Sequence, residues 1–123
     1  MPAFSILRRL KSFVFACQGA RTLLATQHNT WIHAVATVAV VVSGFAWKVS
    51  LLEWALLVFA IGLVWLAEAL NTAIEFLADE VSQEKRERIG KAKDLGAFGV
   101  LVSAITSAVI GLILFLPHFL STQ

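Results

Sequence analysis

The sequence predicts an all-α integral membrane protein, in which an N-terminal amphipathic surface helix precedes three transmembrane helices. The first observation is composition: of 123 residues, 59% are apolar and 15% charged, with a mean hydropathy of +0.81. Soluble domains are typically about 45–50% apolar and about 25% charged. The second observation is that the apolar residues gather in three stretches. The length allows one domain at most, and the composition excludes a disordered chain.

Residues 1–28 are predicted to form the surface helix and a turn. At helical spacing, one side is apolar and the opposite side polar, and a helix of this kind lies in the plane of the membrane interface. Phe15 on the polar side and Arg21 on the apolar side break the pattern. The apolar run around residues 12–16 is too short for a signal peptide. The apolar side holds Ile6, Leu7, Leu10, Phe13, Val14, Cys17 and Leu24, and the polar side Arg8, Lys11, Gln18 and Thr22.

The first and third transmembrane helices are predicted at 30–48 and 95–120. A hydrocarbon core of about 30 Å needs roughly 20 helical residues. Thr30–Trp47 and Leu95–Leu120 contain no Asp, Glu, Lys or Arg. Pro117 and His118 are expected to mark the fraying end of the third helix.

The second transmembrane helix, predicted at 51–75, is different because its apolar part is short. Residues 54–67 span only about 21 Å of helix. The helix must therefore continue through Glu68, Asn71 and Glu75 to reach water. These polar groups are expected at or just inside one membrane face, and residues 76–94 are expected to form a connection outside the membrane.

The basic residues predict the orientation. They gather before the first transmembrane helix and in 76–94, whereas Lys48 stands alone between the first two helices and the C-terminal tail has none. The positive-inside rule places the N-terminus and 76–94 in the cytoplasm and the C-terminus outside. A net charge of +2 is too low for a nucleic-acid binder. The two basic groups are Arg8, Arg9, Lys11 and Arg21, and Lys85, Arg86, Arg88, Lys91 and Lys93.

A stripe of polar residues on the second helix predicts chemistry. Glu68, Asn71, Glu75 and Asp79 share one helix face, and carboxylates at membrane depth indicate function by default. One carboxylate suits Mg²⁺ with phosphate oxygens, and another can take a proton from a hydroxyl group. With the Lys93–Asp94 pair as cation and acceptor, these are the parts of a phosphoryl-transfer site.

Plainer interpretations stay open at this point. Asp79 and the glutamates that follow it are also typical of solvated headgroup-level residues, and Lys93–Asp94 of an ordinary helix start. The chain has no Gly-rich phosphate loop and no protein-kinase motif, so side chains would have to hold any phosphates. His28 and His33 have no metal-ligand spacing. Gly99, Ser103, Ser107 and Gly111 form a small-residue stripe that favours close helix packing and self-association.

These residues resemble the prokaryotic diacylglycerol kinase family, which includes undecaprenol kinases. The resemblance rests on the segment from Glu68 to Glu75 (EALNTAIE), on Asp79, and on residues 91–94 (KAKD), and it extends over nearly the whole chain. It implies a homotrimer with active sites at the cytoplasmic interface, shared between neighbouring subunits. It also implies ATP as co-substrate, Mg²⁺ as cofactor, a membrane lipid as substrate, and a bacterial cytoplasmic membrane as location.

The resemblance also implies roles for individual residues. Glu68 is expected to be the general base on the lipid hydroxyl, supported by Asn71, and Glu75 to bind Mg²⁺. The family commonly has a second metal-binding Glu before the first transmembrane helix, where this chain has Gln27. Nucleotide contacts are expected from Arg8, Phe15, Glu75, Glu84, Lys85, Arg86, Lys93 and Asp94.

The function expected from these residues is ATP-dependent phosphorylation of a membrane lipid hydroxyl. Diacylglycerol is the leading substrate, with phosphatidic acid as product, and undecaprenol is the alternative. A non-enzymatic membrane assembly, or a small ion pathway lined by Glu68 and Glu75, is a more remote alternative that needs no ATP.

Overall fold

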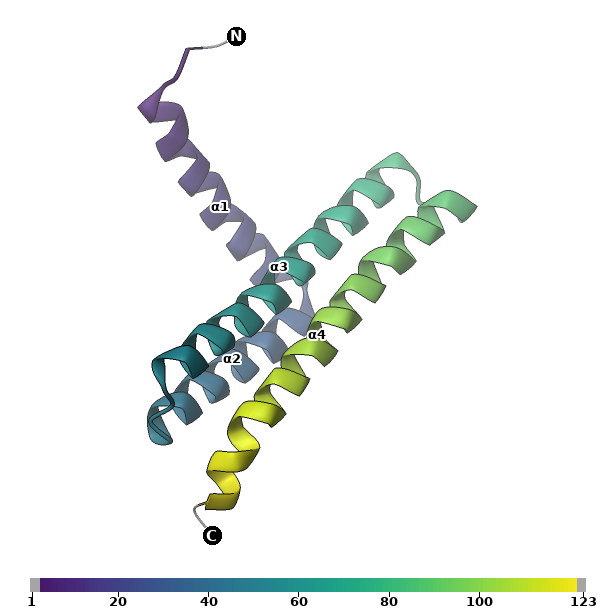
Figure 1. Cartoon of the computed structure of the whole chain (residues 1–123). Coiled ribbons are helices and arrows are strands. Elements are labelled where there is room, and N and C mark those ends of the chain that lie inside the picture. Colours follow the sequence, from purple (N-terminus) through teal and green to yellow (C-terminus); the bar gives the residue numbers. More distant parts are fainter. Residues whose placement is uncertain (1–2, 122–123) are drawn as a thin grey trace.

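The computed structural model describes residues 3–121 and forms four helices in that range: α1 (Ile6–Thr26), α2 (His28–Ala46), α3 (Leu51–Val81) and α4 (Glu87–Ser121). Helices α2, α3 and α4 lie side by side, while α1 projects away from them (Figure 1). Three of the helices, α2 to α4, are long and apolar enough to cross a membrane. The prediction of an all-helical chain with three membrane spans is therefore confirmed.

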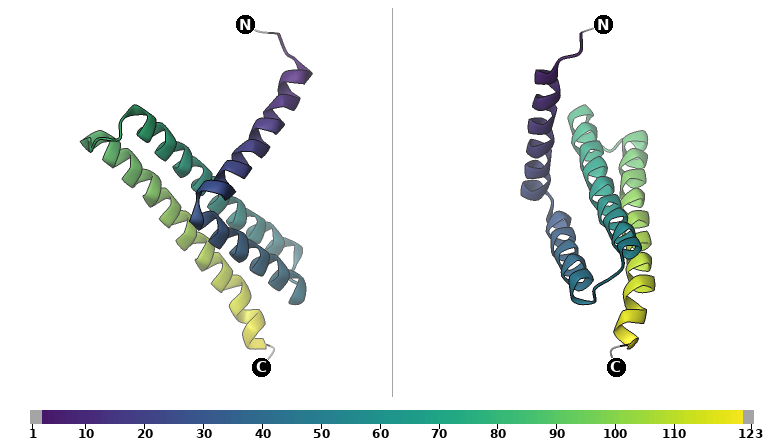
Figure 2. Two further views of the ribbon diagram at one scale, coloured as in Figure 1. Left: turned by 180° about the vertical axis from the view of Figure 1, so that it is seen from behind. Right: turned by 60° about the vertical axis from the view of Figure 1, so that its left-hand side comes forward.

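The connections lie at two opposite ends of the bundle. The N-terminal end of α1 and the α3–α4 connection point to one end, whereas the α2–α3 turn and the C-terminal end point to the other (Figures 1 and 2). The two basic groups identified in the sequence are therefore found toward the same end. This arrangement is the one that the predicted orientation requires.

The helices pack most tightly at the end that carries the α2–α3 turn. Lys48 takes a left-handed conformation there (φ 51°). Ser50 and Glu53 then form a capping box, which satisfies two backbone N–H groups at the start of α3. The buried side chains of Val49, Leu57 and Leu114 form the core just beyond the turn. Since they come from the turn, α3 and α4, they fix how these parts lie against one another.

The small-residue stripe of α4 packs, at its centre, against α3 of the same chain. Ser103 is buried, and the Ser107 hydroxyl donates a hydrogen bond to the carbonyl oxygen of Ala60 (2.9 Å). Small side chains let two helix backbones come close, and an interhelical hydrogen bond of this kind contributes about 0.6 kcal/mol in a membrane. The centre of the stripe therefore has a partner within the chain.

Most of the predicted connection 76–94 is helical in the structure. Helix α3 continues to Val81 and α4 begins at Glu87, so that only residues 82–86 connect them. Hydropathy marks where the hydrocarbon ends, whereas a helix continues for as long as its residues favour it. Residues 76–81 and 87–94 are mostly good helix formers, so both helices extend past the apolar residues.

The third helix ends within one residue of its predicted end, and Pro117 and His118 lie inside it. Pro117 and His118 were expected to mark its fraying end, but α4 continues through both to Ser121. His118 Nε2 lies 2.9 Å from Glu53 Oε2 at the start of α3, and the Ser121 hydroxyl donates to the His118 carbonyl (2.9 Å). These contacts stabilise the last turn, although Pro117 has no N–H to donate.

We expect Gly44→Ala to destabilise the protein, because a Cβ at residue 44 would lie 2.6 Å from the Trp54 ring, which packs on Phe45. Overpacking of this kind costs about 1–3 kcal/mol. The measurement is the midpoint of thermal unfolding in detergent.

Gly62→Ala is the matched control, since a Cβ there meets nothing within 4 Å. The same substitution in an open helical position stabilises by up to about 1 kcal/mol. Equal midpoints for the two variants would contradict the packing of α2 on α3 described above.

Candidate active site

Glu68 is the most deeply buried member of the polar stripe on α3. Only 2% of the residue is exposed, and it faces α2. There its Oε2 atom lies 3.4 Å from Nε2 of His33 on α2. The structure thus places a carboxylate and an imidazole together between two apolar helices.

The antiparallel arrangement of α2 and α3 explains this pairing. Residues at similar distances from the turn face each other. Position 33 lies thirteen residues before the last residue of α2 and position 68 lies seventeen residues after the first residue of α3, so the pair is offset by about one helical turn. About one helical turn nearer to the α2–α3 connection, Trp65 Nε1 donates to the Thr37 hydroxyl (2.9 Å). The Thr37 hydroxyl in turn donates to the His33 carbonyl (2.7 Å). These bonds hold the register in which His33 meets Glu68.

Buried polar atoms without hydrogen-bond partners gather around this pair. Buried polar groups in proteins are nearly always hydrogen-bonded, and each exception needs an explanation. In the described part of the chain the unpaired buried side-chain atoms all belong to α2 and α3. They are Thr30 Oγ1, His33 Nε2, Glu68 Oε2, Asn71 Oδ1 and Thr72 Oγ1. This cluster, the unpaired polar cluster, has the donors and acceptors to bind a polar group brought from outside the chain.

Asn71 takes its place because α4 has a glycine opposite it. A Cβ on Gly96 would collide with Asn71 Oδ1. The missing side chain lets the amide of Asn71 lie against the backbone of α4. The position of Asn71 therefore depends on the identity of residue 96.

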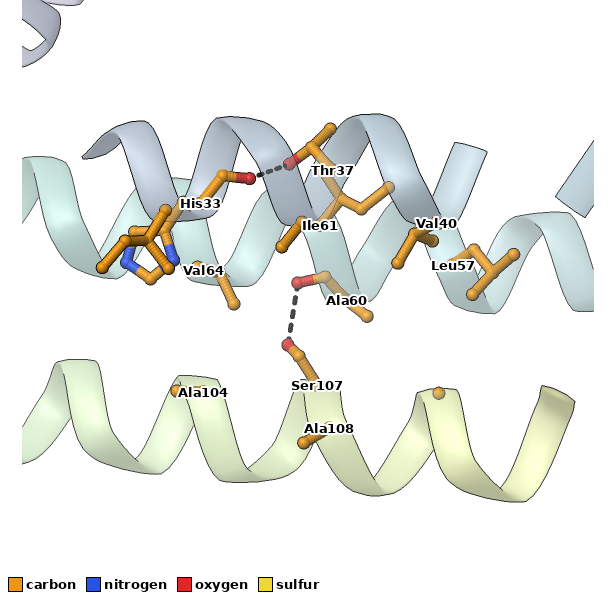
Figure 3. A pocket seen from close by; sticks show the side chains of 13 residues that line it. His33, Thr37, Val40, Leu57, Ala60, Ile61, Val64, Ala104, Ser107 and Ala108 are labelled. Carbon is orange, nitrogen blue, oxygen red and sulfur yellow. Dashed lines mark hydrogen bonds between the residues drawn. The ribbon is translucent and has the colours of Figure 1, made fainter. Parts of the chain in front are cut away.

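An apolar cavity of about 350 Å³ lies between α2, α3 and α4 and has His33 at one end (Figure 3). Most of its lining is aliphatic, and the Ser107 hydroxyl within it is already bonded to Ala60. It suits an apolar chain rather than a polar ligand. The lining residues are Ile32, His33, Ala36, Thr37, Val40, Leu57, Ala60, Ile61, Val64, Ala104, Ser107, Ala108 and Gly111.

A second cavity, of about 410 Å³, lies at the α3–α4 connection and is lined mostly by polar and charged residues. Five of the predicted nucleotide contacts line it: Glu84, Lys85, Arg86, Lys93 and Asp94. Lys93 Nζ also forms an ion pair with Asp79 Oδ1 (2.6 Å), the last carboxylate of the stripe. The structure thus brings together predicted contacts from both sides of the connection.

The predicted contacts on α1 do not join them. Arg8 and Phe15 are exposed, and neither lines the polar cavity. Helix α1 points away from the α3–α4 connection in Figure 1 and in the left view of Figure 2. The chain therefore does not bring its own α1 to this cavity.

The two predicted metal ligands lie on different elements. Glu75 is half-buried on α3, about 10 Å along the helix axis from Glu68. Gln27 lies at the α1–α2 junction, where its amide donates to the Thr26 hydroxyl (3.2 Å). Within residues 3–121, no three His, Cys, Asp and Glu side chains gather as a metal-binding group. Mg²⁺ bound with a nucleotide usually takes only one or two carboxylates, with phosphate oxygens and water completing its shell, so Glu75 fits this kind of site.

Four residues of the site were not predicted from the sequence in these positions: Thr30, His33, Thr72 and Gly96. Counting outward from the α2–α3 turn would have placed position 33 opposite a residue about one helical turn before position 68, so this contact was predictable only to within a turn. The contact between Gly96 and Asn71 has no comparable signal, because it depends on how α4 packs on α3. Asp79 was predicted as part of the stripe, but its ion pair with Lys93 was not.

Comparison with known proteins gives a consistent result. The profile described as "Prokaryotic diacylglycerol kinase" matches residues 14–115. The chain is 39% identical to the undecaprenol kinase of Bacillus subtilis over 110 residues, which cover 89% of each protein. It is 37% identical to a diacylglycerol kinase of Synechocystis over 91% of this chain and 65% of that protein. It is 30% identical to the diacylglycerol kinase of Escherichia coli over 91% of this chain and 92% of that protein. The chain therefore belongs to the prokaryotic diacylglycerol kinase family, and it is a lipid kinase.

Proposed function

We propose that the chain transfers the γ-phosphoryl group of ATP to the hydroxyl of a membrane lipid, with Glu68 as the general base. The observation that carries this proposal is the position of the buried Glu68 carboxylate along α3. Leu57, Ala60, Ile61 and Val64 line the apolar cavity before it, and Ser82 lines the polar cavity after it. A lipid chain in the first cavity and a nucleotide near the second would bring their reacting ends toward Glu68.

The carboxylate is suited to this role because its environment removes competing partners. Glu68 Oε2 lies near His33, and the carboxylate forms no hydrogen bond within the described part of the chain, so its other oxygen, Oε1, is available to accept the proton of an arriving hydroxyl. General-base catalysis of this kind contributes about 10²–10⁴-fold to rate. Asn71, with its unpaired buried oxygen, would orient the same hydroxyl.

The nucleotide is proposed to lie along the polar cavity, in contact with Glu84, Lys85, Arg86, Lys93 and Asp94. Lys93 would exchange Asp79 for phosphate. Glu75, with Gln27 as a neutral second ligand, would hold Mg²⁺, which neutralises phosphate charge when bound. Because α1 of the same chain points away, we propose that Arg8 and Phe15 contact the nucleotide of a neighbouring copy, as in the homotrimer that the resemblance implies.

We propose undecaprenol as the lipid and diacylglycerol as the second candidate. The sequence favoured diacylglycerol, but the identity to the undecaprenol kinase of Bacillus subtilis is higher than the identities to the two diacylglycerol kinases. The identity of 37% to the Synechocystis protein is the observation that favours diacylglycerol.

The site is proposed to face the cytoplasm of a bacterial cytoplasmic membrane, with the C-terminus outside. The basic residues of the α3–α4 connection support this orientation. It brings the polar cavity to the side that has ATP.

We expect purified protein with labelled ATP and Mg²⁺ to phosphorylate undecaprenol faster than diacylglycerol when each is supplied in the same detergent. Glu68→Gln should lower turnover on the better lipid by at least about 100-fold, since an amide accepts no proton. The oligomer and its melting temperature serve as the folding control. Phosphorylation of neither lipid, or full activity of Glu68→Gln, would contradict the proposed function.

Gly96→Ala is expected to lower kcat about 10- to 100-fold by displacing Asn71, because small misplacements of reacting groups have effects of that size. Gly99→Ala, one turn further along α4, is the control, since a Cβ there meets nothing within 4 Å. Steady-state kinetics with the better lipid are the measurement. If both variants matched the wild type, Asn71 would have no part in turnover.

We expect Gln27→Glu to keep or raise activity, because a carboxylate compensates the charge of Mg²⁺ better than a neutral amide does. The half-saturating Mg²⁺ concentration for turnover should fall, and Mg²⁺ with ATP should raise the melting temperature more than in the wild type. Complete loss of activity would show that residue 27 does not lie beside the metal.

A further inference from the structure

We propose that His33 is a positioning residue for Glu68: its imidazole Nε2, which lies 3.4 Å from Glu68 Oε2, would donate to that oxygen during turnover and so hold the other carboxylate oxygen toward the lipid hydroxyl. The proposal rests on the proposed function of Glu68 as the base. It concerns a residue outside the acidic stripe and on a different helix.

Burial makes such a partner necessary. Glu68 is 2% exposed, and burying a polar group without a hydrogen-bond partner costs free energy. Buried polar side chains in proteins are nearly always paired. A donor beside Glu68 would offset this cost and fix the direction in which the carboxylate points.

Among the ion pairs of residues 3–121, the one that includes Glu68 has His33 as partner. The charged residues that face α3 from α4 are engaged elsewhere: Lys93 pairs with Asp79, and His118 pairs with Glu53 at the opposite end of α3. The imidazole is therefore the ionisable group placed to act on this carboxylate.

The contact between His33 and Glu68 is slightly too long for a hydrogen bond, and a small movement of either side chain would form one. The 3.4 Å between His33 Nε2 and Glu68 Oε2 slightly exceeds the usual range of about 2.7–3.2 Å for an N–H···O bond. Both atoms are buried, and neither forms a hydrogen bond with the other or with any other group in the described part of the chain. Catalytic hydrogen bonds are often long before substrate binds and tighten afterwards. The Thr37–Trp65 bond holds this part of α2 against α3, so a small side-chain movement suffices.

The test compares two substitutions at position 33 in the full-length protein. His33→Leu keeps the volume but removes the donor, and we expect kcat to fall about 10- to 100-fold, the range typical of residues that orient a reacting group. KM for ATP should stay within about twofold, because the nucleotide is bound elsewhere. His33→Gln places an amide N–H near the same point, and kcat should recover to within about threefold of the wild type.

Gly44→Ala is the matched control, because it disturbs the packing of the same two helices at the α2–α3 turn without touching the carboxylate. Its kcat should stay within about twofold of the wild type. A loss as large as that of His33→Leu would assign the effect to loosened packing and overturn the proposal. Equal impairment of His33→Gln and His33→Leu, or full activity of both, would also overturn it.

Glu68→Gln separates this inference from the proposed function. If Glu68→Gln is inactive while both His33 variants turn over at the wild-type rate, only the role of His33 fails. If Glu68→Gln is fully active, the assignment of the base fails and the role of His33 fails with it. Circular dichroism and size-exclusion profiles of all variants confirm that each one folds and assembles.

Discussion

A carboxylate buried among apolar helices is the constraint on which the rest of this structure depends. Glu68 is stable there only if the surrounding backbone is held firmly and the polar atoms near it are placed with care. The capping box of Ser50 and Glu53 and the core around Leu57 hold the α2–α3 hairpin at one end. The Thr37–Trp65 hydrogen bond joins α2 and α3 again closer to Glu68. Firm packing at one end thus supports unpaired polar groups further along.

The two ends of the bundle differ in role: one end is packed by buried side chains, and the other carries the candidate site. Near the α2–α3 turn the helices are joined by buried aliphatic and aromatic side chains and by the contact between His118 and Glu53. Beyond Glu68 the helices carry the unpaired polar cluster and lead to a polar cavity at the α3–α4 connection. A binding site has to leave some of its polar groups without internal partners, and here these groups lie away from the packed end.

The sequence was informative about the features that depend on one helix at a time. Hydropathy located the three spans, and helical spacing placed Glu68, Asn71 and Glu75 on one face. It was less informative where two helices meet: the facing of His33 and Glu68, the ion pair of Lys93 with Asp79, and the contact of Gly96 with Asn71 depend on register and packing. Boundaries were missed for a different reason, because 76–81 and 87–94 are polar and yet remain helical. The joint site of Arg8 or Phe15 with the other nucleotide contacts stays a prediction, since it needs more than one copy of the chain.

The ion pair between Lys93 and Asp79 has a consequence for turnover. A lysine side chain that waits in solvent loses much of its rotational freedom when it captures a phosphate, whereas Lys93 is already restrained by its carboxylate neighbour. If Lys93 binds the nucleotide as proposed, its ammonium group pairs with Asp79 while no nucleotide is bound. It would pair with the triphosphate once ATP binds, and with Asp79 again after the diphosphate product has left. Because Asp79 stays beside the site and competes with phosphate for the ammonium group, this arrangement would favour rapid release over tight retention.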